Sequence, residues 1–272
     1  FNSNGISAFV SITRGCDNMC TFCVVPFTRG RERSRDPKSI LNEINKLKEN
    51  GYKEITLLGQ NVDSYLWYGG GLKKDFKKAN NIQKRTAINF AKLLDLVAKC
   101  YPDFRIRFTT SNPQDMDIEV LTTMQTHSNI CNHIHLPVQS GSNKILKAMN
   151  RQHTREEYLN LISNIKKILP NCGISHDIIT GFPNETEKDH IDTLSLMELV
   201  RYDFGFMFKY SERPGTLAAR KMKDNITEKV KQRRLSEIID LQFQHSHKNL
   251  SNYKNKLTEI LIEKESKKST KF

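Results

Sequence analysis

Residues 15–23 read Gly-Cys-Asp-Asn-Met-Cys-Thr-Phe-Cys, which places Cys16, Cys20 and Cys23 in a Cys-x-x-x-Cys-x-x-Cys spacing. These short gaps allow all three sulfur atoms to gather around one inorganic centre. A structural zinc ion normally takes four Cys or His ligands, and no fourth lies nearby. The pattern therefore favours an iron–sulfur cluster with one open iron, and structural zinc is the alternative.

The residues around the cysteines indicate that they lie on a loop. The run Ser7 to Ile12 has the alternation and branched residues of a strand, whereas Pro26 and Gly30 interrupt regular structure after Cys23. In parallel α/β barrels, the loops at the carboxyl ends of the strands build the active site. We therefore expect the cysteines at the catalytic end of such a barrel.

The rest of the chain repeats the alternation of strand and helix. Helices are predicted from Lys38 to Asn50, from an N-cap at Thr154 to a stop at Pro170 and, as a long C-terminal helix, from roughly Thr227 to Asn249. Six strands are predicted, at Ser7–Ile12, Glu54–Leu58, Arg105–Thr109, His133–Leu136, Gly173–Ile179 and Asp203–Lys209. Long crossovers between short strands predict parallel pairing. The fold class is thus α/β, with a partial (βα)6 parallel barrel.

Two segments lie outside this repeat. Residues 1–255 are expected to form the barrel domain with its trailing helix. Residues 256–272 begin with a strand-like run from Leu257 to Ile262 and are too few to fold as a domain. A Lys-rich insertion near residues 73–85 is expected to be mobile surface.

The formal net charge of +13 fits a polyanionic partner. Four arginines follow the cysteine loop and are candidates for contacts with an RNA backbone, a solvated loop being the alternative: Arg29, Arg31, Arg33 and Arg35. Six cysteines without a secretory signal favour a reducing cytoplasm over disulfides. No stretch of about 18 apolar residues predicts a membrane span.

The cysteine triplet after a first strand resembles the signature of radical S-adenosylmethionine (radical SAM) enzymes, and the flanking residues resemble their methylthiotransferase branch. Further similarity to that branch lies in segments 57–62, 107–113, 135–142, 177–183 and 210–216. The resemblance spans nearly the whole chain. It implies a partial barrel that binds a [4Fe-4S] cluster and S-adenosylmethionine.

By this resemblance, Cys16, Cys20 and Cys23 ligate the cluster and its open iron chelates the methionyl group of S-adenosylmethionine. The other expected cofactor-binding residues are Phe22, Gly59, Gln60, Asn61, Gln139, Ser140, Ser142, Asp177 and Arg213. Each has a structural alternative. Gly59 could simply form the turn after a strand, and Ser140 and Ser142 could cap the helix that follows them. Asp177 and Arg213 could each pair with a residue of opposite charge in a purely structural role.

The resemblance also implies an activity and partners. The expected reaction adds a methylthio group to C2 of N6-isopentenyladenosine beside the tRNA anticodon. Sister enzymes act on threonylcarbamoyladenosine in tRNA or on an aspartate of a ribosomal protein, and a non-catalytic zinc-bearing RNA-binding module is a further alternative. A reductant such as flavodoxin or ferredoxin, and a monomeric, cytoplasmic protein without membrane contact, are expected.

Two modules of the family are expected beyond this barrel. A second [4Fe-4S] cluster belongs to an N-terminal domain that precedes Phe1, and residues 256–272 resemble only the start of a TRAM-like RNA-binding β-domain. Cys100, Cys131 and Cys172 each precede a strand. They are therefore expected to be partly buried thiols away from the catalytic end.

Overall fold

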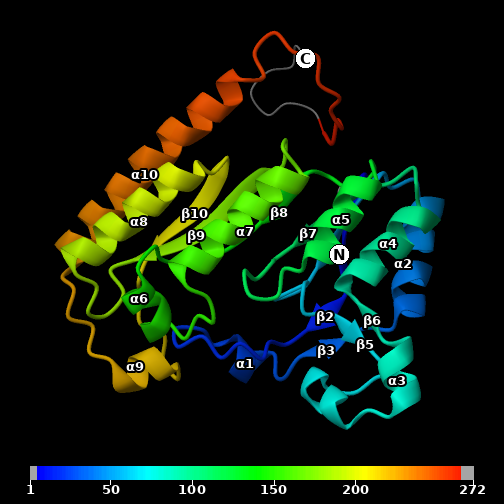
Figure 1. Ribbon diagram of the computed structural model, residues 1–272, viewed down its shortest axis with the longest axis horizontal. Helices are drawn as coiled ribbons and strands as arrows, with labels where there is room; N and C mark the ends of the chain where they lie inside the picture. The colour runs from blue at the N-terminus through cyan, green and yellow to red at the C-terminus, as the bar shows by residue number, and fades with distance from the viewer. Residues whose placement is uncertain (1–4, 265–272) are drawn as a thin grey trace.

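The structure is a computed structural model that describes residues 5–264. Six parallel strands form its centre (Figure 1): β1 (Ser7–Ser11), β4 (Glu54–Leu58), β7 (Arg105–Thr109), β8 (His133–His135), β9 (Gly173–Thr180) and β10 (Phe204–Lys209). All six predicted strands are confirmed, with small shifts at their ends. β1, β4 and β7 pair in one three-stranded sheet, and β8, β9 and β10 pair in another.

A short run of hydrogen bonds joins the two sheets between β7 and β8. Ile106 N donates to Asn129 O at 2.8 Å, and Cys131 N donates to Ile106 O at 2.9 Å. Within residues 5–264, the outer strands β1 and β10 do not pair with each other. The strands thus form an open, partial barrel, as the sequence predicts.

Helices cover the outer face of this barrel (Figure 1): α2 (Pro37–Glu49), α4 (Phe90–Cys100), α5 (Ile118–Thr126), α7 (Arg155–Ile168), α8 (Glu187–Val200) and the long α10 (Glu228–Ser251). The core lies between these helices and the sheets, where Val10, Ile55, Ile106, Ile134 and Ile178 are fully buried. Alternate residues of each strand therefore face the barrel interior, which we call the lumen.

Local sequence explains where these helices begin. Thr154 forms a capping box with Glu157 at the start of α7, as expected for this N-cap, and Asp36 caps α2 by accepting from the backbone N of Lys38. Shorter elements fill the connections: β2 (Thr13–Arg14), α1 (Val25–Thr28), β3 (Arg33–Ser34), β5 (Leu66–Trp67), η1 (Lys73–Lys78), α3 (Asn81–Thr86), β6 (Ile88–Asn89), α6 (Asn143–Ala148) and α9 (Leu217–Lys221).

The Lys-rich insertion lies at the surface, as expected, with most of its basic side chains exposed. It also has local structure, because the β5–β6 ladder closes it at its base and Asn80 forms a capping box at the start of α3. The strand expected from Leu257 to Ile262 is absent from the part of the chain that the structure describes, where this run is exposed and irregular. A strand needs a neighbour to satisfy its backbone groups, and no ladder forms there. The remaining residues, 265–272, lie outside the described range.

Candidate functional site

The cysteine loop leaves β2 at the carboxyl end of the first strand. Gly15 has φ +78°, and a Cβ atom at this position would overlap the carbonyl oxygen of Arg31. Cys16 N donates to Gly30 O at 3.2 Å, so the two ends of the loop are held side by side. The glycine before the first cysteine is therefore needed for this close approach of two backbone segments.

The start of the loop is anchored to α6 from the second half of the chain. Thr21 N donates to Met149 O at 3.0 Å and its hydroxyl donates to Ala148 O at 2.9 Å. Asn150 Nδ2 donates to Met19 O at 3.0 Å. The sulfur positions are thus held between segments more than a hundred residues apart in sequence.

All three cysteines line one cavity of about 150 Å³. Phe22, Gln60, Gln139 and Asp177 also line it. Within residues 5–264, no three His, Cys, Asp or Glu side chains are grouped closely enough to hold a single metal ion. Zinc needs its ligands around one ion, whereas the thiolates of an iron–sulfur cluster bind different irons and stand farther apart. Among the described residues, three thiols line this cavity without a fourth Cys or His, a donor set that fits a cluster with one open iron.

Burial disfavours the thiolate form of two of these cysteines, Cys16 and Cys23. Burial raises the pKa of Cys16 to about 11 and also raises the pKa of Cys23. The backbone N of Val25 and the guanidinium groups of Arg213 and Arg151 act in the opposite direction on Cys23. Iron binds the thiolate form, so a cluster held by these cysteines would require their deprotonation, which Arg213 and Arg151 would favour at Cys23.

Arg151 is a site residue that sequence reasoning missed. Its Nη1 donates to Cys20 Sγ at 3.6 Å, and its Nη2 donates to Pro137 O at 2.8 Å. It follows α6 in a segment without a strand end or a motif, so no local signal marks it. Its position beside the sulfur gives it a means of tuning a thiolate by charge and hydrogen bonding.

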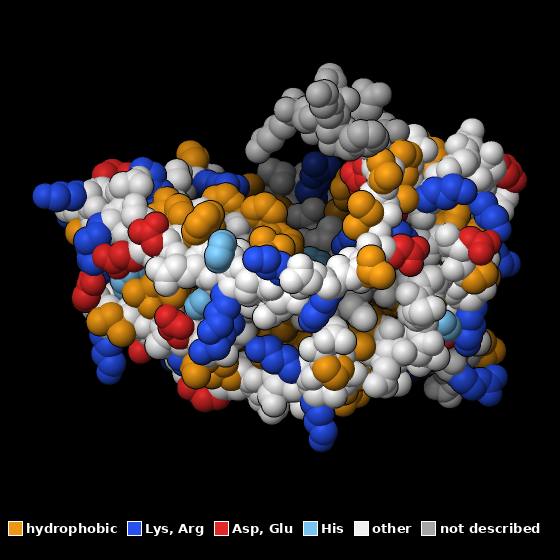
Figure 2. Space-filling model, turned by 90° about the horizontal axis from the view of Figure 1, so that it is seen from above, with side chains coloured by type: hydrophobic (Ala, Val, Ile, Leu, Met, Phe, Trp, Pro, Cys, Tyr) orange, Lys and Arg blue, Asp and Glu red, His pale blue; other side chains and the backbone are white. Residues whose placement is uncertain are grey.

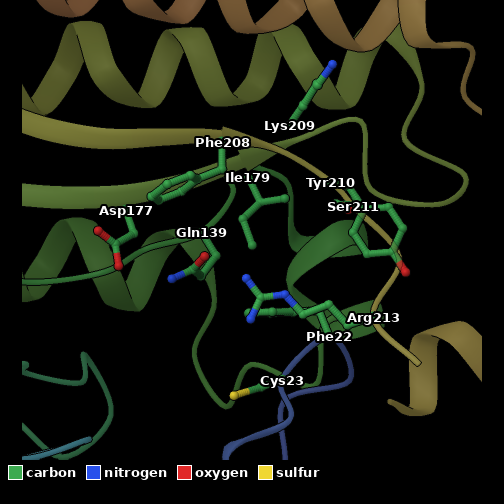
Figure 3. A pocket seen from close by; sticks show the side chains of 10 residues that line it. All are labelled: Phe22, Cys23, Gln139, Asp177, Ile179, Phe208, Lys209, Tyr210, Ser211 and Arg213. Carbon is green, nitrogen blue, oxygen red and sulfur yellow. The ribbon is translucent and has the colours of Figure 1, made fainter. Parts of the chain in front are cut away.

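A second cavity of about 370 Å³ adjoins the first, since Phe22, Cys23, Gln139 and Asp177 line both. Figure 3 shows Arg213 and Phe22 on one side of it, with Gln139, Ile179 and Phe208 opposite. Gln139 has φ +74°, and its backbone pairs with β9 through hydrogen bonds to Asp177 and from Ile179. This bend turns the Gln139 side chain into both cavities.

Asp177 lies at the junction of the cavities and contacts a neighbouring histidine. His135 Nε2 is 3.3 Å from Asp177 Oδ1, and His135 Nδ1 is 2.9 Å from Ser175 Oγ. The His135 ring thus lies between the Asp177 carboxylate on one side and the Ser175 hydroxyl on the other. The acidic residue predicted to need a partner therefore has one, and it still reaches the cavities.

Four of the predicted cofactor-binding residues do not line either cavity. A Cβ at Gly59 would overlap the Thr13 hydroxyl, so this glycine permits close packing. Asn61 is buried and its Nδ2 donates to Asp115 at 2.6 Å. Ser142 Oγ donates to Asp189 at 2.7 Å, and Ser140 Oγ lies 3.4 Å from the Thr193 hydroxyl. The observed contacts of these residues are structural, but they are not the ones expected from the sequence: Gly59 permits close packing, and Ser142 does not use its side chain to cap α6.

The four arginines after the loop have different surroundings. Arg29, Arg31 and Arg33 are exposed, and Arg31 Nε lies 3.2 Å from Asp17 Oδ1. Arg35 is half-buried, with Nη1 2.6 Å from Glu43 Oε2 and 2.9 Å from Ser11 O. Arg35 thus ties α2 to β1, whereas Arg29 and Arg33 present charge to solvent after the cysteine loop and Arg31 is exposed but paired with Asp17.

The other cysteines lie away from both cavities. Cys131 and Cys172 are half-buried before β8 and β9, as expected. Cys100 is exposed at the end of α4 and so differs from the partly buried thiol expected there, because the last turn of this amphipathic helix turns that position outward. None of the three lines the cysteine-loop cavity.

The Radical SAM superfamily profile matches residues 10–197. This range begins in β1, contains all three cysteines, Gln139 and Asp177, and ends in α8. The chain belongs to the radical SAM superfamily. A [4Fe-4S] cluster and S-adenosylmethionine are implied by membership of this family, in agreement with the fit of the cysteine donor set.

Curated relatives of this radical SAM chain carry a common name. It is 72% identical over 269 residues to the tRNA-2-methylthio-N(6)-dimethylallyladenosine synthase of Christiangramia forsetii, covering 99% of this chain and 56% of the relative. It is 65% identical over 268 residues to the enzyme of that name from Flavobacterium psychrophilum, covering 98% and 56%. The chain thus spans about half the length of these relatives.

Solved structures support the fold. The radical S-adenosylmethionine methyltransferase TsrM from Kitasatospora setae aligns with a TM-score of 0.58 at 14% identity, covering 78% of this chain and 38% of that one. Methylornithine synthase aligns with a TM-score of 0.57 at 15% identity, covering 88% and 63%. Separately, no helix within residues 5–264 combines the length and apolar character that a membrane span requires.

Proposed function

We propose that this chain is the radical SAM barrel of a tRNA methylthiotransferase that modifies C2 of N6-dimethylallyladenosine beside the anticodon. The observation that carries this proposal is the 72% identity, over nearly the whole chain, to a synthase named for that product. The cavity lined by Cys16, Cys20 and Cys23 supplies the matching chemistry.

Cys16, Cys20 and Cys23 would hold the cluster, and the two adjoining cavities would hold S-adenosylmethionine. When bound, this pair supplies radical chemistry, and the protein's part is to bind and orient the reactants. Phe22 forms an aromatic wall shared by both cavities, and Gln60 offers an amide beside the cysteines. Arg213 provides a cation whose planar guanidinium suits a carboxylate.

Arg29, Arg31 and Arg33 would contact the phosphate backbone of the anticodon loop. Their exposed side chains directly follow the loop that carries the cysteines, where a polyanion must approach if one of its bases is to react. Bases in a loop can leave the stack without opening a duplex. Arg35 is not part of this proposed surface, since its half-buried guanidinium is held by Glu43, Ser11 O and Ser39 together, whereas, within residues 5–264, Arg31 is exposed and contacts Asp17 alone among acidic side chains.

Other parts of the proposal concern the full-length gene product. A second [4Fe-4S] cluster on a preceding domain would supply the sulfur, and a flavodoxin or ferredoxin would supply electrons. Residues 256–272 would begin a TRAM-like RNA-binding domain. A cytoplasmic monomer is the expected state. The length of the curated relatives supports further modules, since about half of each lies beyond this match.

A gene deletion tests the substrate directly. Nucleosides from the deletion strain are examined by mass spectrometry, with the full-length gene and a Cys20→Ala version reintroduced. We expect methylthio-dimethylallyladenosine to disappear, its unmethylthiolated precursor to accumulate, and only the wild-type gene to restore the product. Unchanged levels of the product in the deletion strain would refute the substrate.

The same analysis separates the alternatives. Loss of a methylthio group from threonylcarbamoyladenosine, or from a ribosomal-protein aspartate, would identify a sister activity. Metal analysis that finds zinc in place of iron in the anaerobically purified protein would identify the zinc-bearing RNA module. If the barrel functions without a sulfur donor, the isolated chain will form 5′-deoxyadenosine anaerobically without methylthiolation.

A further inference from the structure

Strand β10 carries phenylalanines at alternate positions that remain half-exposed. The exposed fractions of Phe204, Phe206 and Phe208 are 43%, 53% and 52%. On the other face of the strand, a Cβ at Gly205 would overlap the His176 ring, and Met207 packs against the hydrophobic core. The three phenyl rings therefore face the lumen, and we call them the phenylalanine ladder (Phe204, Phe206 and Phe208).

The ladder is an ordered surface. The rings of Phe204 and Phe206 meet edge to face with centroids 6.0 Å apart. His133 stacks on Phe204 at 5.2 Å, and His135 meets Phe206 edge to face at 5.9 Å. Such contacts fix the ring orientations while leaving part of each ring open to a ligand.

The ladder is continuous with the candidate site. In the β9–β10 register, Phe206 is opposite Asp177 and Phe208 is opposite Ile179. Phe208 and Ile179 line the same cavity as Phe22 and Arg213 (Figure 3). Figure 2, viewed from the side opposite the cysteine loop, shows hydrophobic side chains beside a hollow on that face as well. An apolar wall thus runs from the cofactor cavities into the lumen.

We propose that Phe206 and Phe208 bind the dimethylallyl group of the substrate nucleoside. This proposal rests on the proposed function, which places C2 of the adenine at the cofactor cavities. C6, which carries N6, is separated from C2 by N1 in the six-membered ring, so the five-carbon arm on N6 extends beyond the reacting carbon when C2 lies at the cofactor cavities. The arm is branched and wholly apolar, which matches Phe208 and Ile179 at the cavity and the half-exposed ring of Phe206 on the same face of β10.

The ladder also provides a reason for discrimination between modified adenosines. A threonylcarbamoyl group at N6 carries a carboxylate and a hydroxyl. Against two phenyl rings these groups would lose water without gaining hydrogen bonds, which is unfavourable. The same wall that attracts a dimethylallyl arm therefore rejects the substrate of the sister enzymes.

The test compares two anticodon stem-loop RNAs, one with N6-dimethylallyladenosine and one with adenosine, for binding to the full-length gene product. For wild type we expect tighter binding of the dimethylallyl RNA. Phe206→Ala should reduce this preference on the order of tenfold, and Phe206→Ala with Phe208→Ala further, because a hydrophobic pocket discriminates by about 10- to 200-fold. Affinity for the adenosine RNA should remain within about twofold.

Phe243→Ala is the matched control, because Phe243 is 72% exposed on the outer helix α10. It should leave the preference unchanged, and Phe206→Leu should retain part of it. An unchanged preference in the double variant, or equal weakening of both RNAs, would overturn the proposal and indicate that the ladder packs on another protein segment. Absence of any preference in wild type would overturn it as well.

The proposed function fails by a different result, namely a wild-type protein that forms 5′-deoxyadenosine but never methylthiolates the dimethylallyl RNA. Methylthiolation of that RNA with an unaltered preference in the Phe206 variants would leave the proposed function intact and refute only the role of the ladder.

Discussion

Gln139 and Ser142 lie three positions apart in one loop, yet their side chains serve opposite purposes. Gln139 lines both cavities, and no protein partner is recorded for its side chain within residues 5–264. Ser142 is buried and donates to Asp189 on α8. The contrast teaches that polar groups at strand ends divide into those satisfied by the fold and those reserved for a ligand.

The same division extends over two larger sets of residues. The cavity group consists of Cys16, Cys20, Cys23, Gln139, Asp177 and Arg213. The buried network consists of Ser142, Asp189, Glu185 and Arg234, which join the carboxyl-end loops to α8 and α10. Variants of the cavity group should impair ligand binding with little loss of stability, and variants of the buried network should do the reverse.

The largest expected effect is the loss of the cluster from single cysteine variants. Each of Cys16→Ala, Cys20→Ala and Cys23→Ala should remove the brown chromophore and nearly all bound iron after anaerobic reconstitution, because each thiolate is an obligate ligand. Iron and sulfide analysis measures this. Cys172→Ala is the matched control and should retain both, since Cys172 lies before β9 away from the cavity. Retention of iron by any of the three variants would show that the substituted cysteine is not a cluster ligand.

Next in size is the buried ion pair of the network. Arg234 Nη1 lies 2.8 Å from Glu185 Oε2 and both side chains are buried. Arg234→Met leaves the Glu185 charge without its partner and should lower the free energy of unfolding by about 3–5 kcal/mol. Urea denaturation measures the change. The control is Lys99→Met, which removes an exposed ion pair with Asp95 and should lower the free energy of unfolding by about 1 kcal/mol or less. Equal losses of unfolding free energy in both variants would contradict the claim that the buried Arg234–Glu185 pair stabilises the fold.

A pH-dependent effect is expected from Asp63, which holds Asn112 at the edge of the cysteine cavity. Burial raises the pKa of Asp63 to about 7, against hydrogen bonds from Asn112 N and the Ser111 hydroxyl that lower it. Between about pH 4 and pH 7, the Asp63 carboxyl is protonated in the folded protein and ionised in the unfolded chain. The free energy of unfolding therefore falls as the pH rises through this range. The slope is up to about 1.4 kcal/mol per pH unit.

Urea denaturation from pH 5 to pH 8 measures that slope in wild type and in Asp63→Asn. The variant cannot ionise at this position, so its stability should fall less toward pH 7. Identical slopes in the two proteins would show that Asp63 titrates normally in the folded state.

The smallest effects come from the two residues that open this comparison. Gln139→Asn keeps a residue type that tolerates positive φ and shortens the side chain. It should raise the KM for S-adenosylmethionine in 5′-deoxyadenosine formation by about tenfold, equivalent to about 1.4 kcal/mol. Ser142→Ala should leave that KM unchanged and cost about 1–2 kcal/mol of unfolding free energy, because Asp189 loses a buried donor. A raised KM in Ser142→Ala together with an unchanged KM in Gln139→Asn would contradict the division between the cavity group and the buried network.

The sequence predicted the parts of this protein that follow from local patterns. Cysteine spacing located the sulfur ligands, and alternating strands and helices predicted the partial barrel. Thr154 marked the start of α7 because an N-cap is encoded within a few residues. These signals are short-range, so one chain is enough to read them.

What the sequence did not predict depends on tertiary contacts. Arg151 reaches Cys20 across more than a hundred residues, and Ser142 turns toward α8 instead of the cavity. The aromatic alternation in β10 predicted a strand but not that its phenyl rings face an open lumen. The sequence alone does not distinguish a hydrophobic residue that packs in the core from one that lines a ligand site.

The central claim is that three thiolates hold a [4Fe-4S] cluster whose remaining iron is open to S-adenosylmethionine. The most direct measurement is electron paramagnetic resonance of the reduced, anaerobically reconstituted chain before and after adding S-adenosylmethionine. The account predicts a cluster signal that shifts on addition and 5′-deoxyadenosine formed in the same sample. Zinc in place of iron, or a cluster signal unaffected by S-adenosylmethionine, would contradict it.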